Sequence, residues 1–180
     1  MRIFIGIQIG EELIKQILKW EDRHQTLLRK IEPGADIFVR WLKPENLHIT
    51  VIPPWDTEDI ESVKNNLEQI NKIGAFEIMF DYVSYGPKIK HPRLIWTGGQ
   101  THKKFLELKS NLEDITGIKD NHQETLIHLT LARFKEPYFK KISSAKINEN
   151  IIWKDIVSEI TLFQSFPGSE YKILKKIPFG

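Results

Sequence analysis

The sequence predicts an α+β protein of two pseudo-symmetric, β-rich lobes, with antiparallel sheets, helices on their outer faces and a groove between the lobes. The first observation is composition, because 180 residues with 41% hydrophobic and 28% charged side chains are typical of a globular domain with a sizeable core. The second is order, because each half of the chain reads strand, helix, strand, helix, strand. The third is the motif His-x-Thr, which occurs once in each half, at His48 and Thr50 and at His128 and Thr130. We therefore expect residues 1–180 to form a single domain of two lobes.

The first half contains apolar segments with strand and helix periodicity. We expect strands over 2–9, 37–42, 47–52 and 76–82, and helices over about 11–29 and from Ile60 to Ile70. Gly10 ends the first strand. Pro53-Pro54 is expected to stop the third strand, because proline cannot donate to a strand ladder. Asp56 or Thr57 is the expected N-cap of the second helix.

The second half repeats this order. We expect strands over 93–97, 126–134 and near 151–153, 158–164 and 171–177, a helix through 105–115 and a short helix over about 138–146. Gly98-Gly99 is expected to separate the first of these strands from the helix that follows it. Thr101 is the expected cap of that helix, because it directly precedes the helical spacing of Phe105, Leu108 and Leu112.

Each His-x-Thr motif lies in an apolar alternation. Successive side chains of a strand point to opposite faces, so His48 and Thr50 share one face, and so do His128 and Thr130. Six His and nine Thr among 180 residues give about 0.3 copies of the motif by chance. A single copy would more often be a partly buried strand histidine, but two copies in matching strands predict a site where the two lobes face each other.

The residues present exclude several kinds of site. The chain has no cysteine, which removes disulfides, thiolate metal ligands and cysteine nucleophiles. Glu11 and Glu12 follow the first apolar segment too soon for a signal peptide, and no apolar run approaches about eighteen residues, so we expect a cytoplasmic protein without a membrane partner. A metal site would need ligands beyond the two motif histidines, and Gly98-Gly99 lacks the Lys-Ser/Thr of a phosphate loop. We expect neither a metal nor a nucleotide cofactor.

These motifs resemble a known family, the 2H phosphoesterases, which are named for two His-x-Thr/Ser motifs on opposing lobes. Within it the chain resembles in particular the LigT-type RNA 2′,3′-cyclic phosphodiesterases, historically called 2′-5′ RNA ligases. The segments that carry the resemblance are 2–5, 40–50, 92–96, 128–133 and 168–174, of which 40–50 and 128–133 are the specific ones. The chain departs from the family pattern at 51–55 and at Ile127, positions that concern the rim of the groove.

The resemblance implies a metal-independent hydrolase that opens RNA 2′,3′-cyclic phosphate ends to 2′-phosphomonoesters, with 2′-5′ RNA ligation as the reverse direction. Opening the ring requires one proton to leave the attacking water and another to reach the departing ribose oxygen. Histidine, with an ordinary pKa of about 6.5, performs either step near neutrality. The resemblance implies that His128 is the base and His48 the acid, and the chemistry also allows the opposite order. Residues 1–180 would then be a single catalytic domain.

The motif threonines and one arginine are candidates for phosphate binding. Thr50 and Thr130 place hydroxyls beside the histidines, where they can donate to non-bridging phosphate oxygens. The resemblance adds Arg133, whose guanidinium would pair with phosphate. Strict alternation puts Arg133 on the face opposite His128, so it reaches the phosphate only through a bulge or a strong twist, and otherwise is a surface arginine. Candidates for base stacking, equally suited to the core, are Trp41, Trp55, Tyr85 and Phe134. The histidines expected at the surface are His24, His91, His102 and His122.

Two classes of function remain open. The first is an enzyme, acting on RNA ends or, like other members of the family, on 2′-5′ linkages or a small cyclic nucleotide. The second is a non-catalytic RNA-binding module that retained the groove. In both classes the partner is an RNA end or a cyclic nucleotide, and we expect a monomer.

Overall fold

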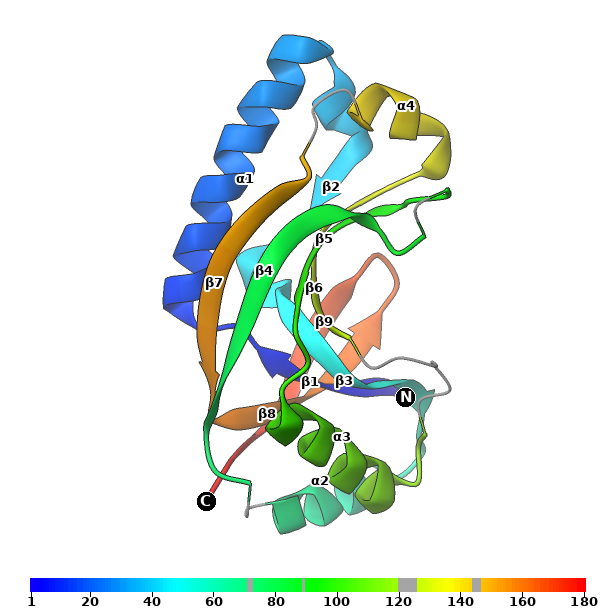
Figure 1. Cartoon of the computed structure of the whole chain (residues 1–180). Coiled ribbons are helices and arrows are strands. Elements are labelled where there is room, and N and C mark those ends of the chain that lie inside the picture. The colour runs from blue at the N-terminus through cyan, green and yellow to red at the C-terminus, as the bar shows by residue number, and fades with distance from the viewer. Residues whose placement is uncertain (71–72, 89, 120–125, 144–146) are drawn as a thin grey trace.

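Two antiparallel sheets organise the structure, a computed structural model that describes residues 1–70, 73–88, 90–119, 126–143 and 147–180 (Figure 1). The four-stranded sheet comprises β1 (Arg2–Gln8), β3 (His48–Asp56), β8 (Glu159–Phe166) and β9 (Glu170–Pro178), in the order β3-β1-β8-β9. The five-stranded sheet comprises β2 (Val39–Trp41), β4 (Phe76–Gly86), β5 (Leu94–Gly99), β6 (Ile127–Phe134) and β7 (Glu149–Val157), in the order β2-β6-β5-β4-β7. The helices are α1 (Glu11–Ile31), α2 (Ile60–Leu67), α3 (Lys103–Thr116) and α4 (Phe139–Ile142), and 3₁₀ turns lie at Ala35–Phe38, Pro44–Asn46, Glu68–Ile70 and Glu136–Tyr138.

Helices cover the outer side of each sheet. Figure 1 shows α1 running alongside β7 of the five-stranded sheet, and α2 and α3 side by side beneath the four-stranded sheet. The two sheets approach each other along β3 and β6. The predicted α+β class, with two β-rich lobes, antiparallel sheets and outer helices, is confirmed.

The lobes are not the two halves of the chain. β2 and β4 come from the first half but belong to the five-stranded sheet, whereas β8 and β9 come from the second half but belong to the four-stranded sheet. The helices are exchanged as well. α1 follows β1 yet packs on β7, and α3 follows β5 yet packs on β3. Each lobe is therefore complete only with segments from both halves.

The two motif strands occupy equivalent positions. β3 pairs antiparallel with β1, and β6 pairs antiparallel with β5, so each motif strand lies beside the strand that begins its half of the chain. The apolar residues that alternate with the motifs are buried, as the sequence predicts: Leu47, Ile49, Val51, Ile127, Leu129 and Leu131. This burial of one face fixes the register, because a shift by one residue would expose the whole apolar set.

Pro53-Pro54 does not stop β3, contrary to expectation, and the strand continues to Asp56. β3 is an edge strand, where a proline without an N–H removes no ladder hydrogen bond. The pairing with β1 also shifts here, since Ile3 faces Trp55 whereas Ile5 faces Ile52. The prolines thus lie in a bulge on an open edge, the position in a sheet where proline is tolerated.

Gly98-Gly99 does not break the chain, because both glycines lie within β5. The Tyr82 side chain lies against Gly98, where a Cβ would come within 2.6 Å of the ring carbon Cζ. At Gly99 a Cβ would collide with the carbonyl group of Met79. Glycine is required at both positions because neighbouring atoms approach the backbone more closely than a side chain would allow.

α2 and α3, the two helices that were assigned an N-cap, are each capped by a later residue than expected. α2 is capped by Asp59, whose carboxylate accepts from the Ser62 backbone N–H at 2.9 Å. α3 is capped by His102 instead of Thr101, and its Nδ1 accepts from the Lys104 N–H at 3.2 Å. Several consecutive polar residues precede each of these helices, so the composition of the segment alone does not show which residue adopts the extended backbone of an N-cap.

Three further boundaries differ from the sequence prediction or pass beyond the described residues. Residues 35–38 form a 3₁₀ turn, so β2 is shorter than the strand expected over 37–42. The expected short helix is α4, while 144–146 at its predicted end lie outside the described part of the chain. Residues 120–125 lie outside it as well.

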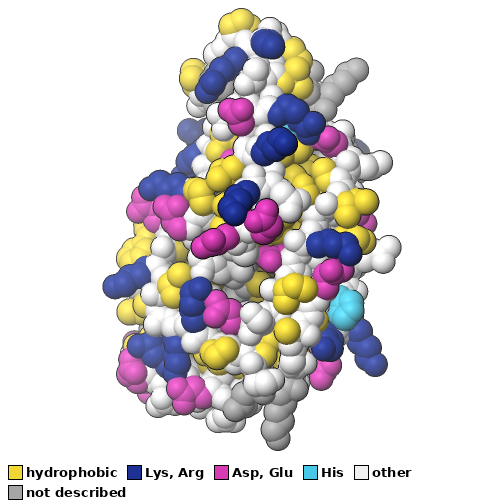
Figure 2. Space-filling model, turned by 90° about the vertical axis from the view of Figure 1, so that its left-hand side faces the viewer, with side chains coloured by type: hydrophobic (Ala, Val, Ile, Leu, Met, Phe, Trp, Pro, Cys, Tyr) yellow, Lys and Arg dark blue, Asp and Glu magenta, His cyan; other side chains and the backbone are white. Residues whose placement is uncertain are grey.

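The surface mixes charges of both signs. Figure 2 shows the side of the molecule formed by α1 and β7, where Lys and Arg alternate with Asp and Glu, in line with a net charge of only +2. None of the helices in the described ranges has the length and apolar character needed to span a membrane.

We predict that Gly99→Ala lowers the free energy of unfolding by about 1–3 kcal/mol, because the added methyl group must displace the Met79 carbonyl. Urea denaturation measures this change. Lys172→Ala, at an exposed position of β9, is the matched control and should change stability by less than about 0.5 kcal/mol. Equal unfolding midpoints for Gly99→Ala and the original protein would contradict the close approach.

Candidate active site

Both His-x-Thr motifs line one cavity of about 240 Å³ where β3 and β6 meet. β3 contributes His48 and Thr50, and β6 contributes His128, Thr130 and Arg133. The remaining lining residues are Phe4, Leu42, Pro54, Leu94, Ser165 and Tyr171. The structure thus brings together all five residues that the sequence singled out, from two sheets and from positions far apart in the chain.

The two imidazoles are held by the same contact. Nδ1 of His48 donates to the carbonyl of Asn46 at 2.7 Å, and Nδ1 of His128 donates to the carbonyl of Leu126 at 3.2 Å. A carbonyl oxygen only accepts, so in each ring the proton of the neutral form is placed on Nδ1. Nε2 is then the nitrogen that takes up or releases a proton in both histidines.

His48 is enclosed by three aromatic rings. Its centroid lies 4.8 Å from Phe4, 4.9 Å from Tyr171 and 5.4 Å from Phe163. This burial lowers the pKa of His48 to about 4, against the opposing effect of the hydrogen bond to Asn46, and the positive charges of Arg133 and His128 lower it further. Near neutral pH, His48 is therefore an uncharged imidazole in the free protein.

His128 has a more open setting. Its hydrogen bond to the Leu126 carbonyl lies at an exposed end of β6, and its ring contacts Trp96 at a centroid distance of 5.1 Å. The two imidazoles therefore share their tautomer but differ in their environment.

Arg133 reaches the cavity through a bulge, the feature that strict alternation required of it. Ile95 of β5 pairs with Ala132, but the next residue, Trp96, pairs with Thr130, so Leu131 is an extra residue in β6. The bulge reverses the alternation, and Arg133 joins the face of His128. Its Nε is buried and has no hydrogen-bond partner among the described residues, which suits a group that binds an anion.

β3 carries the same irregularity at the same place. Gly6 pairs with Thr50 and Ile5 with Ile52, so Val51 is an extra residue directly after the first motif, as Leu131 is after the second. Each motif is thus followed by a bulge that turns the end of its strand toward the cavity.

Sequence reasoning missed the contribution of the hairpin formed by β8 and β9, which places Ser165 and Tyr171 at the cavity. The Arg40 guanidinium donates to the Gly168 carbonyl at 2.7 Å and to the Ser169 hydroxyl at 3.1 Å. The Asn46 side chain donates to the Ser169 carbonyl at 3.4 Å. The resemblance included residues 168–174, but strand periodicity by itself gave Tyr171 no role.

The aromatic residues considered for base stacking are absent from the cavity lining. Tyr85 donates its hydroxyl to the Ile142 carbonyl at 2.8 Å, and Phe134 packs edge to face on Tyr85. Trp41 and Trp55 pack against the core. The rings beside the motif histidines are instead those of Phe4, Phe163, Tyr171 and Trp96.

One of the other histidines is placed differently from expectation. His24 is buried rather than at the surface, stacked on Trp20 at 3.9 Å. His102 caps α3, and His91 is exposed and pairs with Glu136. His122 lies outside the described residues.

The cavity is identified by its chemistry and not by its size. Hollows of about 420 Å³ beside Gly10 and 580 Å³ beside Trp20 are larger, but neither contains a motif residue. Within the described ranges, no three His, Asp or Glu side chains are grouped closely enough to hold a metal ion.

The chain is similar to known phosphoesterases in sequence and in fold. The model of the family described as LigT like Phosphoesterase matches residues 14–96, which include His48 and Thr50. Two relatives carry the name RNA 2′,3′-cyclic phosphodiesterase. That of Aquifex aeolicus is 25% identical over 164 residues, covering 84% of this chain and 87% of its own, and that of Methanothermobacter thermautotrophicus is 24% identical over 145 residues, covering 76% and 73%. This chain is thus similar in sequence to the LigT-like phosphoesterases.

Solved structures share the fold of this chain over nearly all of its length. A crystal structure from Thermus thermophilus has a TM-score of 0.73 at 19% identity and covers 99% of this chain and 98% of that chain. E. coli LigT in apo form has a TM-score of 0.72 at 21% identity, with 99% and 96% covered. The complex of E. coli LigT with 3′-AMP gives 0.69 at 22% identity, with 99% and 97% covered. At these identities the likeness concerns the arrangement of the two sheets.

We predict that the ring of His48 in the ligand-free protein stays uncharged between pH 7 and 5, because its enclosure lowers its pKa to about 4. Tyr171→Ala removes one enclosing ring and admits water, so the pKa of His48 should rise toward its ordinary value of about 6.5. An NMR titration of the ring nitrogens measures both. In the unfolded chain the His48 ring binds a proton at about pH 6.5, whereas in the folded protein it does so only near pH 4. The protein should therefore also lose stability as the pH falls from about 6.5 to about 4.

Tyr138→Ala is the matched control for Tyr171→Ala, because Tyr138 stacks on Phe38 away from the cavity. It should leave the titration of His48 unchanged. A midpoint near 6.5 for His48 in the original protein would show that the aromatic enclosure does not govern its charge.

Proposed function

We propose that this protein is an RNA 2′,3′-cyclic phosphodiesterase that forms a 2′-phosphomonoester without a metal ion. The observation that carries the proposal is the cavity, in which two imidazoles from different sheets meet a buried guanidinium N–H that has no partner within the described part of the chain. The names of the two relatives support the choice of substrate. Because the cavity takes its residues from both lobes, residues 1–180 are proposed to work as a single catalytic domain.

Hydrolysis forms a bond between the oxygen of water and phosphorus, and it breaks the bond between phosphorus and O3′ of the ribose. The attacking water loses a proton to one imidazole, and O3′ leaves as a hydroxyl after it receives a proton from the other. The phosphate remains on O2′, and the two histidines end the reaction with their charges exchanged. This step requires two groups that can each take up or release a proton, and the Nε2 atoms of His48 and His128 are proposed to be these groups.

The phosphate is proposed to bind Thr50, Thr130 and Arg133. The two hydroxyls can donate to non-bridging oxygens, on which negative charge builds in the transition state. The Arg133 Nε–H, buried and unpaired among the residues described, gains a hydrogen bond when the phosphate enters. These donors belong to the strand segments around the two bulges, so the phosphate is held by both sheets at once.

The charge states support His48 as the base and His128 as the acid. A base must begin the reaction without a proton, and the lowered pKa of His48 keeps it in that form near neutral pH. The resemblance to the family implies the opposite order, which requires the bound phosphate to raise the pKa of His48 enough to charge it. The leaving oxygen distinguishes the two orders, because only the acid acts on it.

We predict that the protein converts 2′,3′-cyclic AMP into 2′-AMP in the presence of EDTA, and that His48→Ala and His128→Ala each lower kcat by about 10²–10⁴-fold, the usual contribution of a general acid or base. Chromatography of the product measures the rate. His91→Ala should retain activity, because His91 pairs with Glu136 away from the cavity. Binding of RNA without turnover in the original protein would favour a non-catalytic RNA-binding module.

We predict that a cyclic substrate with sulfur in place of O3′ restores much of the activity of His128→Ala but not of His48→Ala. A thiolate leaves without a proton, so the loss of the acid matters little, whereas the loss of the base still matters. The comparison uses kcat of each variant with the sulfur substrate relative to the oxygen substrate. Restoration in His48→Ala instead would assign the acid to His48.

The same site is proposed to carry out 2′-5′ ligation, with the 5′-hydroxyl of a second RNA in place of water as the nucleophile. The base then takes its proton from that hydroxyl, and every other step is unchanged. The proposed partners are RNA ends, the protein is proposed to act as a monomer in the cytoplasm, and 2′-5′ linkages or small cyclic nucleotides are alternative substrates for the same residues.

A further inference from the structure

Two aromatic rings lie close to the backbone on the face of the five-stranded sheet that carries the second motif. Tyr82 of β4 covers Gly98, and Trp96 of β5 covers Gly86, where a Cβ would come within 2.5 Å of the indole ring. Both glycines are buried beneath these rings, while Tyr82 and Trp96 themselves are half-buried. We call Tyr82 and Trp96 the aromatic platform.

The register places this platform directly beside the candidate active site. Gly98 pairs with His128 on one side and with Tyr82 on the other, so Tyr82 lies two strands, or about 10 Å, from His128 along one row. In the next row Trp96 pairs with Thr130. Residues paired across neighbouring strands share a face, so the platform continues the wall of the cavity that holds His128 and Thr130.

The rings of the platform are fixed in place. The Trp96 Nε1–H donates to the Ser84 hydroxyl at 3.0 Å, and the two glycines let the rings lie against the backbone while both residues stay half-exposed. Neither ring is part of the cavity lining, and the chemistry proposed above uses neither. Rigid aromatic rings on an open sheet surface are a recurrent means of stacking the bases of single-stranded RNA.

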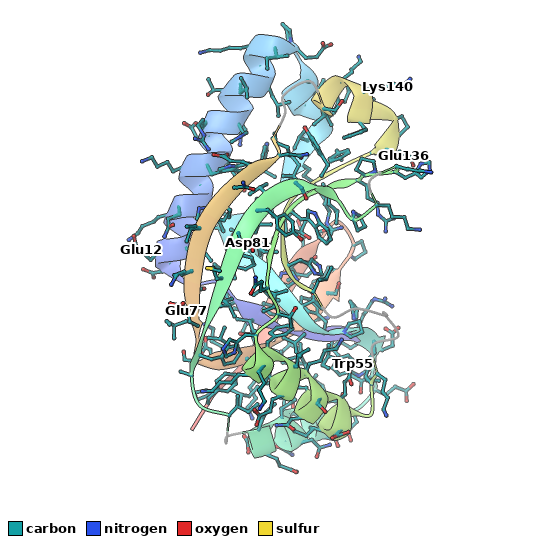
Figure 3. All side chains as sticks on the ribbon, viewed as in Figure 1. Glu12, Trp55, Glu77, Asp81, Glu136 and Lys140 are labelled. Atoms are coloured by element: carbon teal, nitrogen blue, oxygen red, sulfur yellow. The ribbon has the colours of Figure 1, made fainter. Side chains whose placement is uncertain are left out.

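The charges around the platform indicate which part of an RNA would contact it. Asp81 precedes Tyr82, and its charge acts on the Tyr82 hydroxyl. Glu77, further along β4, is paired with Lys154 of β7 at 2.9 Å (Figure 3). Alternation along β4 turns the Asp81 side chain to the face opposite Tyr82. Stacked bases carry no charge, so a strand of RNA would place its bases on the uncharged rings of this face and its backbone toward solvent.

We propose that the aromatic platform binds the bases of the nucleotides that precede the cyclic phosphate, so that the substrate is the 3′ end of a single-stranded RNA and not a mononucleotide. This inference rests on the proposed function, because it places the terminal phosphate between His48 and His128. The chain upstream of that phosphate then passes over the wall formed by Trp96 and Tyr82.

The test compares kcat/KM for a tetranucleotide with a 2′,3′-cyclic end and for 2′,3′-cyclic AMP, at low and at high salt. The original protein should prefer the tetranucleotide by about tenfold or more. Tyr82→Leu and Trp96→Leu should each reduce this preference by about fivefold to a hundredfold, the range expected for the loss of one stacked base. Because stacking and not charge provides the preference, it should persist at high salt.

Two controls accompany these variants. Tyr82→Phe keeps the ring and should keep the preference. Tyr138→Leu removes a tyrosine that stacks on Phe38 away from the cavity, and it should have no effect on the preference. An equal kcat/KM for both substrates, or a preference that survives Tyr82→Leu and Trp96→Leu, would overturn the inference.

Failure of the inference and failure of the proposed function give different results. If the original protein hydrolyses neither substrate, the proposed function fails. The platform is then tested by NMR, since stacking of a tetranucleotide with a 2′-phosphate end should shift the ring protons of Tyr82 in the unmodified protein. The same measurement applies if Tyr82→Leu does not fold, and unshifted ring protons would overturn the inference in either case.

Discussion

The site depends on the meeting of two sheets along β3 and β6, each anchored by a fully buried apolar face. Leu47 and Ile49 behind the first motif, and Ile127 and Leu129 behind the second, have no exposed surface. Neither strand can slide or turn without exposing these side chains, so the polar residues between them are held on a fixed surface. The bulge after each threonine then turns the strand end toward the cavity, and the buried Nε–H of Arg133 lies at the cavity with the two imidazoles.

Most of what the sequence predicted concerns properties that are local to one segment. Alternation placed His128 and Thr130 on one face of a strand and Leu129 on the other, and the structure agrees. What it could not predict depends on neighbours that are distant along the chain. The expectation that Pro53-Pro54 stops β3 was wrong, because the open edge that tolerates these prolines is a property of the whole sheet. The expectation that Gly98 breaks β5 was wrong, because the ring that covers Gly98 comes from another strand.

The hairpin of β8 and β9 connects the two lobes at the point where His48 is held. Arg40 belongs to the five-stranded sheet, and Gly168 and Ser169, to which it donates, belong to the tip of a hairpin of the four-stranded sheet. Asn46 donates to Ser169 and accepts from His48, so one residue joins the position of the hairpin to the orientation of the imidazole. Spreading the lobes would break these contacts together. The orientation of the His48 imidazole therefore depends on the same contacts that keep the two sheets close together.

The exchange of helices between the lobes has a further consequence for how the chain can be divided. A fragment that ends midway would contain α1 without β7, the strand on which it packs, and the remaining fragment would contain α3 without β3. The first fragment would keep β1, β3 and α2 but lose β8 and β9 of the same sheet. Neither product of such a cut therefore holds a complete sheet with all of its covering helices. We therefore expect the two lobes to fold as one cooperative unit, with neither stable after the chain is cleaved midway.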